Sequence, residues 1–156
     1  MRTAKKTLIA ASATLALAGF GAAPAMAAPA PSASVQVDQT QQIRDLILSQ
    51  TNQQRAAAGL PALLPSASLD AFAQDCTQQQ ADARSMFHCA RPADFGLAWA
   101  ENVAYGYGPE QVVGGWMDSP GHRANILNPR YTHLGVGYAV DADGRTHFTQ
   151  NFQLPR

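Results

Sequence analysis

The chain contains 156 residues, of which 46% are hydrophobic, and its basic and acidic side chains cancel to a net charge of zero. This length accommodates one domain comfortably and two only with difficulty. The lack of a basic surplus argues against nucleic acid as a partner.

Residues 1–27 have the three parts of a secretory signal peptide. Basic side chains precede an apolar stretch over residues 8–20, and the small residues Ala25 and Ala27 fit cleavage before Ala28. An uncleaved membrane anchor is the alternative, but a span needs about 20 apolar residues, and polar residues interrupt this stretch. Cleavage would leave 129 residues with a net charge of −3 and no lysine. We therefore expect a secreted protein with no transmembrane segment in its mature form.

A short leader and a first helix are expected next. Residues 28–40 are rich in Ala, Pro, Ser and Gln and are interpreted as a flexible leader, and residues 41–156 are interpreted as a single domain. A capping-box pattern at Asp38 and Gln41 predicts the start of a helix, and Gly59 is suited to end it.

A second helix is predicted over residues 69–87, where apolar residues recur at helical spacing. Cys76 lies in its middle, and Cys89 follows it. Two cysteines in an exported protein predict one disulfide; two free or intermolecular thiols are the alternative. Because disulfide Cα atoms lie within about 7 Å of each other, the chain after Arg84 must double back, which places His88 against this helix.

Shorter elements follow in the second half of the chain. We expect a strand near residues 99–104, a short helix with Pro109 in its first turn, and another helix with Ser119 as its N-cap. Alternating apolar residues on both sides of Asp143-Gly144 predict a β-hairpin. Helices followed by an antiparallel hairpin indicate an α+β fold rather than a doubly wound parallel sheet.

Three polar side chains are candidates for chemistry. His122 falls near the third position of its helix, where the helix dipole favours the neutral, metal-binding imidazole. Glu101 lies within an apolar strand, where a carboxylate must be paired or hydrogen-bonded. The plain alternatives are an exposed histidine without a role, a structural ion pair, and for His88 a buried imidazole bonded to backbone. His133 and His147 are interpreted as structural or surface residues, and His147 is expected to face solvent.

Two runs of the sequence are distinctive: Trp-Ala-Glu-Asn-Val-Ala over residues 99–104, and Ser-Pro-Gly-His-Arg-x-Asn over residues 119–125. They resemble segments of the bacterial CAP superfamily, which comprises cysteine-rich secretory proteins, antigen 5 and the pathogenesis-related-one proteins. The resemblance covers about residues 41–154. It implies an α-β-α sandwich around a three-stranded antiparallel sheet.

The resemblance also implies a central cavity lined by two histidines and two glutamates, where divalent metals bind. Position by position, the histidines correspond to His88 and His122 and the first glutamate to Glu101. The second glutamate has no counterpart, because Asp118 and Ser119 stand in its place. Two histidines and one carboxylate with an open position are compatible with a zinc site. We therefore expect the two histidines to be metal ligands in a cavity that Glu101 and Ser119 also line.

Three functions are compatible with the sequence. The favoured one is a secreted binding module whose cleft holds a small apolar ligand, lipid-like by analogy with relatives, or a divalent cation such as zinc. The second is a metal-dependent hydrolase or peptidase with Glu101 as general base. The third is an extracellular scaffold that contacts the cell wall or other proteins and uses its histidines structurally. The missing second acid argues against an enzyme, and the fold alone does not decide among the three.

Overall fold

The computed structural model of the chain describes residues 33–95 and 98–154. The predicted signal peptide and the first residues of the predicted leader lie outside these ranges. The described helices are α1 (Ala33–Ala57), α2 (Ala67–Ala83), α3 (Val112–Asp118) and α4 (Pro120–Ile126). The strands are β1 (Leu64–Pro65), β2 (Trp99–Tyr105), β3 (His133–Val140) and β4 (Thr146–Gln153), and a short 3-10 helix, η1 (Ala93–Phe95), precedes β2.

The strands form one sheet in the order β1-β3-β4-β2. Strands β3 and β4 pair antiparallel around the turn at Asp143 and Gly144, as predicted, and β2 pairs antiparallel with β4. The sheet has a fourth strand that the sequence did not predict, because the chain between α1 and α2 runs along the edge of β3. There the N–H of Leu64 donates to the carbonyl of Thr132, and the N–H of Ser66 donates to the carbonyl of Leu134. The resulting strand β1 is parallel to β3 and only two residues long, too short for a periodic signal.

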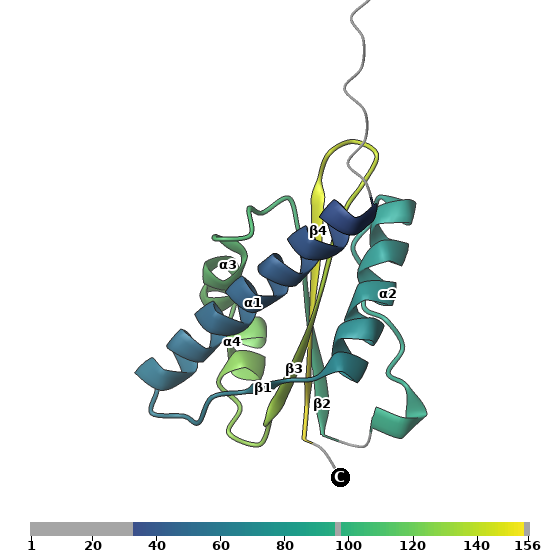
Figure 1. Cartoon of the computed structure of the whole chain (residues 1–156). Coiled ribbons are helices and arrows are strands. Elements are labelled where there is room, and N and C mark those ends of the chain that lie inside the picture. Colours follow the sequence, from purple (N-terminus) through teal and green to yellow (C-terminus); the bar gives the residue numbers. More distant parts are fainter. Residues whose placement is uncertain (1–32, 96–97, 155–156) are drawn as a thin grey trace, which may run out of the picture. The chain divides into compact units, whose positions relative to one another are not determined.

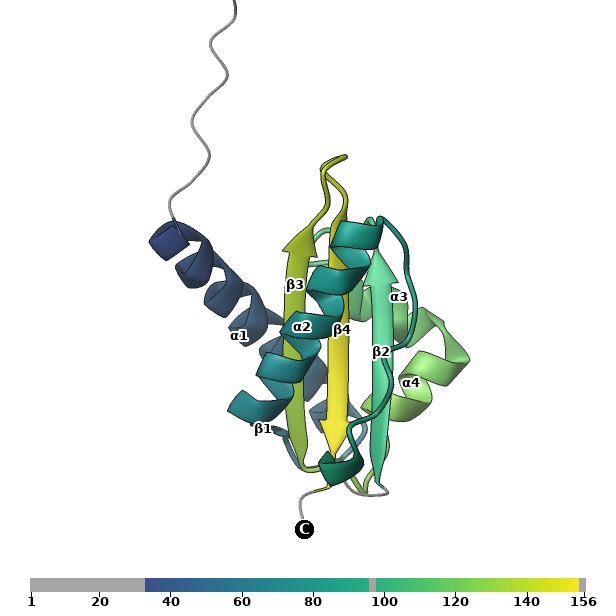
Figure 2. The same cartoon turned by 90° about the vertical axis from the view of Figure 1, so that its right-hand side faces the viewer.

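Helices cover both faces of this sheet (Figures 1 and 2). Helix α2 packs on one face, and α1, α3 and α4 pack on the other. The expected α+β fold with an α-β-α sandwich is therefore confirmed. The hydrophobic core lies between the sheet and α1, α3 and α4, and its most enclosed members are Ile47, Val112, Trp116, Ile126, Leu134, Phe148 and Phe152.

Helix α2 approaches the other face unusually closely, because β3 carries glycines beneath it. A Cβ atom added to Gly135 would lie 2.2 Å from the carbonyl carbon of Leu69, and one added to Gly137 would lie 2.2 Å from the carbonyl oxygen of Ala73. Such distances exclude any side chain at these two positions unless α2 moves. The two glycines therefore set how near α2 lies to the sheet.

Two helix boundaries differ from the sequence prediction. Helix α1 begins at Ala33, so residues 33–40, which were expected to belong to a flexible leader, are helical. This stretch contains no Gly or Pro and is rich in Gln, a good helix former. Helix α2 ends at Ala83 rather than near Phe87, because Arg84 adopts the left-handed conformation, with a φ of 50°.

Candidate functional site

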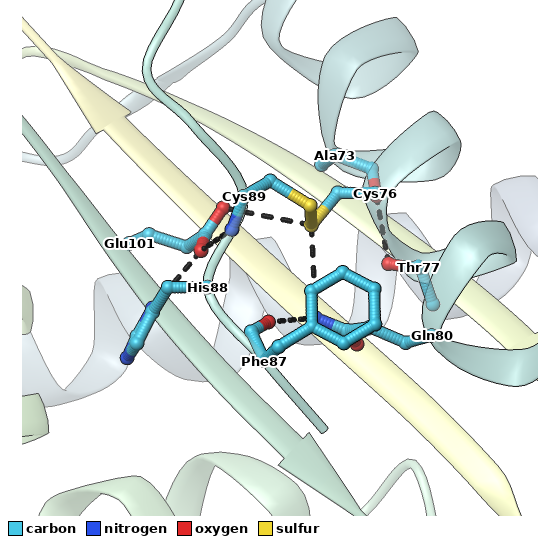
Figure 3. The surroundings of a disulfide bond; sticks show 8 residues. All are labelled: Ala73, Cys76, Thr77, Gln80, Phe87, His88, Cys89 and Glu101. Carbon is cyan, nitrogen blue, oxygen red and sulfur yellow. Dashed lines mark hydrogen bonds and ion pairs between the residues drawn. A yellow bond between two sulfur atoms is a disulfide. The ribbon is translucent and has the colours of Figure 1, made fainter. Parts of the chain in front are cut away.

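The buried carboxylate of Glu101 lies at the centre of the candidate site. Its side chain is 1% exposed. Its position on β2 faces it towards α2, opposite Asn151 of β4. The Oε1 atom accepts a hydrogen bond from the backbone N–H of Cys89 at 2.9 Å and lies 2.9 Å from Nδ1 of His88. Figure 3 shows these contacts. The sequence-based expectation that this carboxylate must be hydrogen-bonded is thus met.

A disulfide supports the carboxylate from the other side. Cys76 of α2 and Cys89 are bonded, with their Cα atoms 5.9 Å apart, which confirms the predicted pairing. The second oxygen of Glu101, Oε2, lies 3.8 Å from the Cys76 sulfur, a contact without a shared proton because a disulfide sulfur carries none. The chain doubles back after Arg84 as expected, and Gln80 Nε2 donates to the carbonyl of Phe87 at 2.6 Å. The returning segment that carries His88 is therefore tied to α2 at two points.

The environment of Glu101 perturbs its acidity. Burial raises the pKa of this carboxyl group above its ordinary value, and the N–H of Cys89 and the imidazole of His88 oppose part of that rise. Burial disfavours the charged form of the carboxyl group, whereas hydrogen-bond donors favour it. Burial therefore outweighs the contacts with Cys89 and His88 and leaves the pKa of this group raised.

His88 is anchored through one nitrogen and open through the other. Its side chain is 63% exposed, and its ring extends away from Glu101 (Figure 3). When Nδ1 donates to the carboxylate, Nε2 carries the lone pair. The alternative of a buried histidine bonded to backbone is therefore wrong for His88, because the partner is a side chain and the ring is exposed.

His122 lies at the third position of α4, where the sequence placed it. Ser119 is the N-cap residue, with an extended backbone, and its carbonyl accepts the N–H of Arg123 at 2.9 Å. The Ser119 side chain makes no capping hydrogen bond. Burial lowers the pKa of His122, and the charge of His88 lowers it further. Both effects favour the neutral form of the His122 imidazole.

Two asparagines that the sequence analysis did not single out attach α4 to β2. Asn102 donates to the carbonyl of His122 at 3.2 Å, and Asn125 donates to Oδ1 of Asn102 at 2.8 Å. Asn125 also donates to the backbone carbonyl of Glu101 at 3.4 Å. Both asparagines stand in the two distinctive sequence runs, so their positions beside Glu101 and His122 were a usable signal. They set the position of His122 relative to Glu101.

The donor groups available to a metal fall into two sets. Within residues 33–95 and 98–154, one group of three has its ligand atoms within 4.8 Å of one another, namely Cys76, Cys89 and Glu101. Its sulfurs are joined in the disulfide and are therefore not thiolate ligands in this state. The predicted set of His88, Glu101 and His122 is only partly assembled. Glu101 contacts His88 directly, but among the described residues these three do not form a group with all ligand atoms within 4.8 Å of one another.

Comparison with known proteins assigns the chain to a class. The model of the Cysteine-rich secretory protein family, CAP, matches residues 48–152. The protein therefore belongs to the CAP family, as the two distinctive runs suggested. Within the described part of the chain, no helix combines the length and the apolar character needed to cross a membrane.

Three bacterial proteins illustrate the similarity. The uncharacterized protein YkwD of Bacillus subtilis is 36% identical over 118 residues, which cover 68% of this chain and 45% of YkwD. An extracellular SCP-domain protein of Bacillus anthracis has 26% identity and a TM-score of 0.64, over 81% of this chain and 45% of that one. An outer surface protein of Borrelia burgdorferi has a TM-score of 0.66 at 20% identity, over 72% of this chain and 92% of that one, which shows the shared fold alone. The chain thus spans less than half of YkwD.

Proposed function

We propose that this CAP protein is an exported binding module in which His88 and His122 hold a divalent cation such as zinc. The observation that carries the proposal is the contact between His88 Nδ1 and the buried Glu101 carboxylate at 2.9 Å. Metal-binding histidines commonly donate their second ring N–H to a carboxylate, which fixes the tautomer and directs the other nitrogen outward. Glu101 has this relation to His88, so we assign it the role of orienting partner rather than ligand.

The electrostatics of the two histidines support the same role. A cation binds only the neutral imidazole, and burial already favours that form of His122. Two histidines leave coordination positions open for water or for an anionic group of a ligand. The donor chemistry therefore fits an open metal site, with coordination positions that a ligand can occupy, better than a closed structural site.

The hydrolase alternative receives less support from the geometry. A general base must reach a water molecule with a free oxygen. Glu101 has Oε1 engaged by Cys89 and His88, Oε2 against the disulfide, and a side chain that is 1% exposed. We therefore favour binding over catalysis for this carboxylate.

Two further parts of the proposal concern location and ligand. We propose that residues 1–27 direct export, which is consistent with a disulfide, a bond that persists in oxidising compartments. We also propose that the module takes a small apolar or lipid-like ligand, which rests on the family resemblance. Binding of a fluorescent fatty acid to the purified protein tests this second part. No binding at saturating protein would refute it.

Zinc titration by calorimetry tests the metal site. We expect the purified protein to bind one zinc ion, and His88→Ala and His122→Ala each to abolish binding. His133→Ala is the matched control, because His133 is half-buried and its ring Nδ1 bonds to the hydroxyl of the neighbouring Thr132. Glu101→Gln should weaken binding by about 10- to 100-fold through loss of orientation. Equal zinc affinity in all four variants would refute the assignment.

A further inference from the structure

A pocket lies at the end of the molecule where α2 and β2 finish and the β3–β4 hairpin turns. Figure 2 shows these three segments at the same end. The pocket has a volume of about 320 Å³ and is lined by Arg84, Ser85, Met86, Tyr105 and Arg145. This volume is at the lower end of the range for small-molecule sites. None of the lining residues belongs to the site of His88, Glu101 and His122.

Arg84 occupies a backbone position that normally favours glycine. It is the described residue other than glycine with a positive φ, at 50°. It ends α2 with its N–H bonded to the carbonyl of Ala81, and the N–H of Ser85 bonds to that of Gln80. Glycine adopts this helix-ending conformation at lower cost than any other residue. A charged side chain is thus held in the pocket wall at a conformational cost.

The ion pair of Arg84 with Asp143 does not account for the conformational cost of its positive φ. Its Nη1 atom lies 3.5 Å from Oδ1 of Asp143, and both side chains are about half exposed. Exposed pairs of this kind contribute little to stability. This pair therefore offsets little of the conformational cost at Arg84.

Arg145 brings a second guanidinium to the same place. Its Nη2 atom lies 2.9 Å from Oδ2 of Asp143, so the two arginines converge on one exposed carboxylate. Asp141 forms a second ion pair with Arg145, in which Oδ2 of Asp141 lies 3.4 Å from Nε of Arg145. Although burial acts in the opposite direction, the N–H of Arg145, His147 and further donors lower the pKa of Asp141 to about 2. Asp141 therefore stays charged and fixes the Nε side of Arg145. The other N–H donors of Arg145 face the pocket.

Two exposed hydrophobic side chains form another part of the wall. Tyr105 is 49% exposed and Met86 is 46% exposed. One side of the Tyr105 ring stacks on the buried imidazole of His147, with centroids 6.2 Å apart and planes at 26°. A ring held on one side and open on the other is a platform for a planar group. The pocket thus combines a site for an oxyanion with a surface for an aromatic or apolar body.

We propose that this pocket binds a small organic anion, with Arg84 and Arg145 holding a carboxylate or phosphate head and Tyr105 and Met86 contacting a flat apolar body. The side chain of Asp143 shows where the head binds, because its carboxylate already lies between the two guanidiniums. The ligand replaces this carboxylate on binding. Arginine pairs suit such heads because guanidinium presents parallel donors to two oxygens.

Phenyl phosphate is the probe that tests the proposal, with inorganic phosphate and phenol as the separate halves of the molecule. Binding is followed through the NMR signals of the arginine Nε–H groups and of the backbone amides near Ser85 and Arg145. We expect phenyl phosphate to bind about tenfold more tightly than either half. Comparing the affinities of benzoate and phenyl phosphate determines whether the pocket prefers a carboxylate or a phosphate head. Binding of inorganic phosphate as tight as that of phenyl phosphate would overturn the assignment of the apolar wall.

Matched variants separate the site from general surface charge. Arg84→Gln and Arg145→Gln should each weaken phenyl phosphate binding by about tenfold, whereas Arg130→Gln, an exposed arginine outside the pocket, should not. Asp143→Asn should strengthen binding, because it removes the competing carboxylate. Arg84→Gly should unfold at the same or a higher temperature and still lose affinity, so a folding defect cannot mimic the result. Unchanged affinity in Arg84→Gly, or no gain in Asp143→Asn, would overturn the proposal.

Discussion

The two faces of the sheet are both buried, but they differ in how many of their buried polar groups have hydrogen-bond partners. On the face covered by α1, α3 and α4, Asn102 donates to Gln150 at 3.2 Å and Gln150 donates to Thr51 at 2.8 Å, so the buried polar groups form a connected chain. On the face covered by α2, the Thr149 hydroxyl and Nδ1 of His147 have no hydrogen-bond partner among the described residues.

This difference separates stability from function. A satisfied polar network within an apolar core rigidifies the fold. Asn102, Gln150 and Thr51 form such a network beneath α1, although Oε1 of Gln50 in α1 has no partner among the described residues. The α2 face instead carries the disulfide, the buried Glu101 and buried polar groups without hydrogen-bond partners. We infer that the first face provides most of the stability and that the second holds His88 and Glu101, whereas His122 is held from the first face by Asn102. Four predictions test this comparison.

The largest effect is expected from the apolar face. Phe148 is fully buried in the hydrophobic core, so Phe148→Ala should lower the free energy of unfolding by about 3–5 kcal/mol. Urea denaturation followed by circular dichroism measures the change. The NMR signals of the His88 ring should stay unchanged in the folded variant, because His88 lies on the other side of the sheet. A loss below about 1 kcal/mol would contradict the assignment of this face as the main source of stability.

Removal of the disulfide should act on both stability and site. The double variant Cys76→Ala/Cys89→Ala should lose about 3 kcal/mol, as expected for a loop of this size. It should also disturb the contact between His88 and Glu101, since Cys89 donates to the same oxygen. The pH titration of the His88 ring by NMR detects this second effect. An unaltered titration curve would mean that the disulfide does not position His88.

Two matched threonines compare the faces directly. Thr51 and Thr149 are both fully buried, but only the hydroxyl of Thr51 has a partner, Gln150. Thr51→Val should therefore cost about 1–2 kcal/mol, because it leaves the Gln150 amide unsatisfied, whereas Thr149→Val should be neutral or slightly stabilising. Equal losses in the two variants would remove the distinction between the faces.

The smallest effect concerns pH. Burial raises the pKa of Glu101 above 4.5 in the folded protein, so the folded state binds this proton more tightly than the unfolded state. That stabilisation is present at low pH and is lost as the pH rises through 4.5 towards the folded pKa. Glu101→Gln cannot titrate and should gain stability relative to the native protein as the pH rises above 4.5. Denaturation midpoints at several pH values measure this, and a pH-independent difference would contradict it.

Local features of the fold were predictable from the sequence. The turn at Asp143 and Gly144 was expected because alternating apolar residues on both sides left one register for the strands. The Ser119-Pro120 start of α4 was expected because serine and proline are suited to the first positions of a helix. The disulfide followed from the presence of two cysteines in a chain with an export signal.

Long-range features were not predictable in the same way. His147 was expected to face solvent, and it does lie on the opposite side of β4 from Phe148, but it is fully buried and 3.1 Å from Asp141. Periodicity tells which residues share a face but not what covers that face. Strand β1 was missed for a similar reason, since its existence depends on β3, nearly 70 residues further along the chain.

The candidate site divides along the same line. The identities of His88, Glu101 and His122, the net charge of −3 after loss of residues 1–27, and the family resemblance all follow from residue order alone. The tertiary structure decided that Glu101 contacts His88 and Cys89 rather than facing water, because the hydrogen bonds of a buried carboxylate depend on segments that meet only after folding. It likewise brought Arg84 and Arg145 to one pocket, since 60 positions separate them in the sequence and only the packing of α2 beside the β3–β4 hairpin closes that gap.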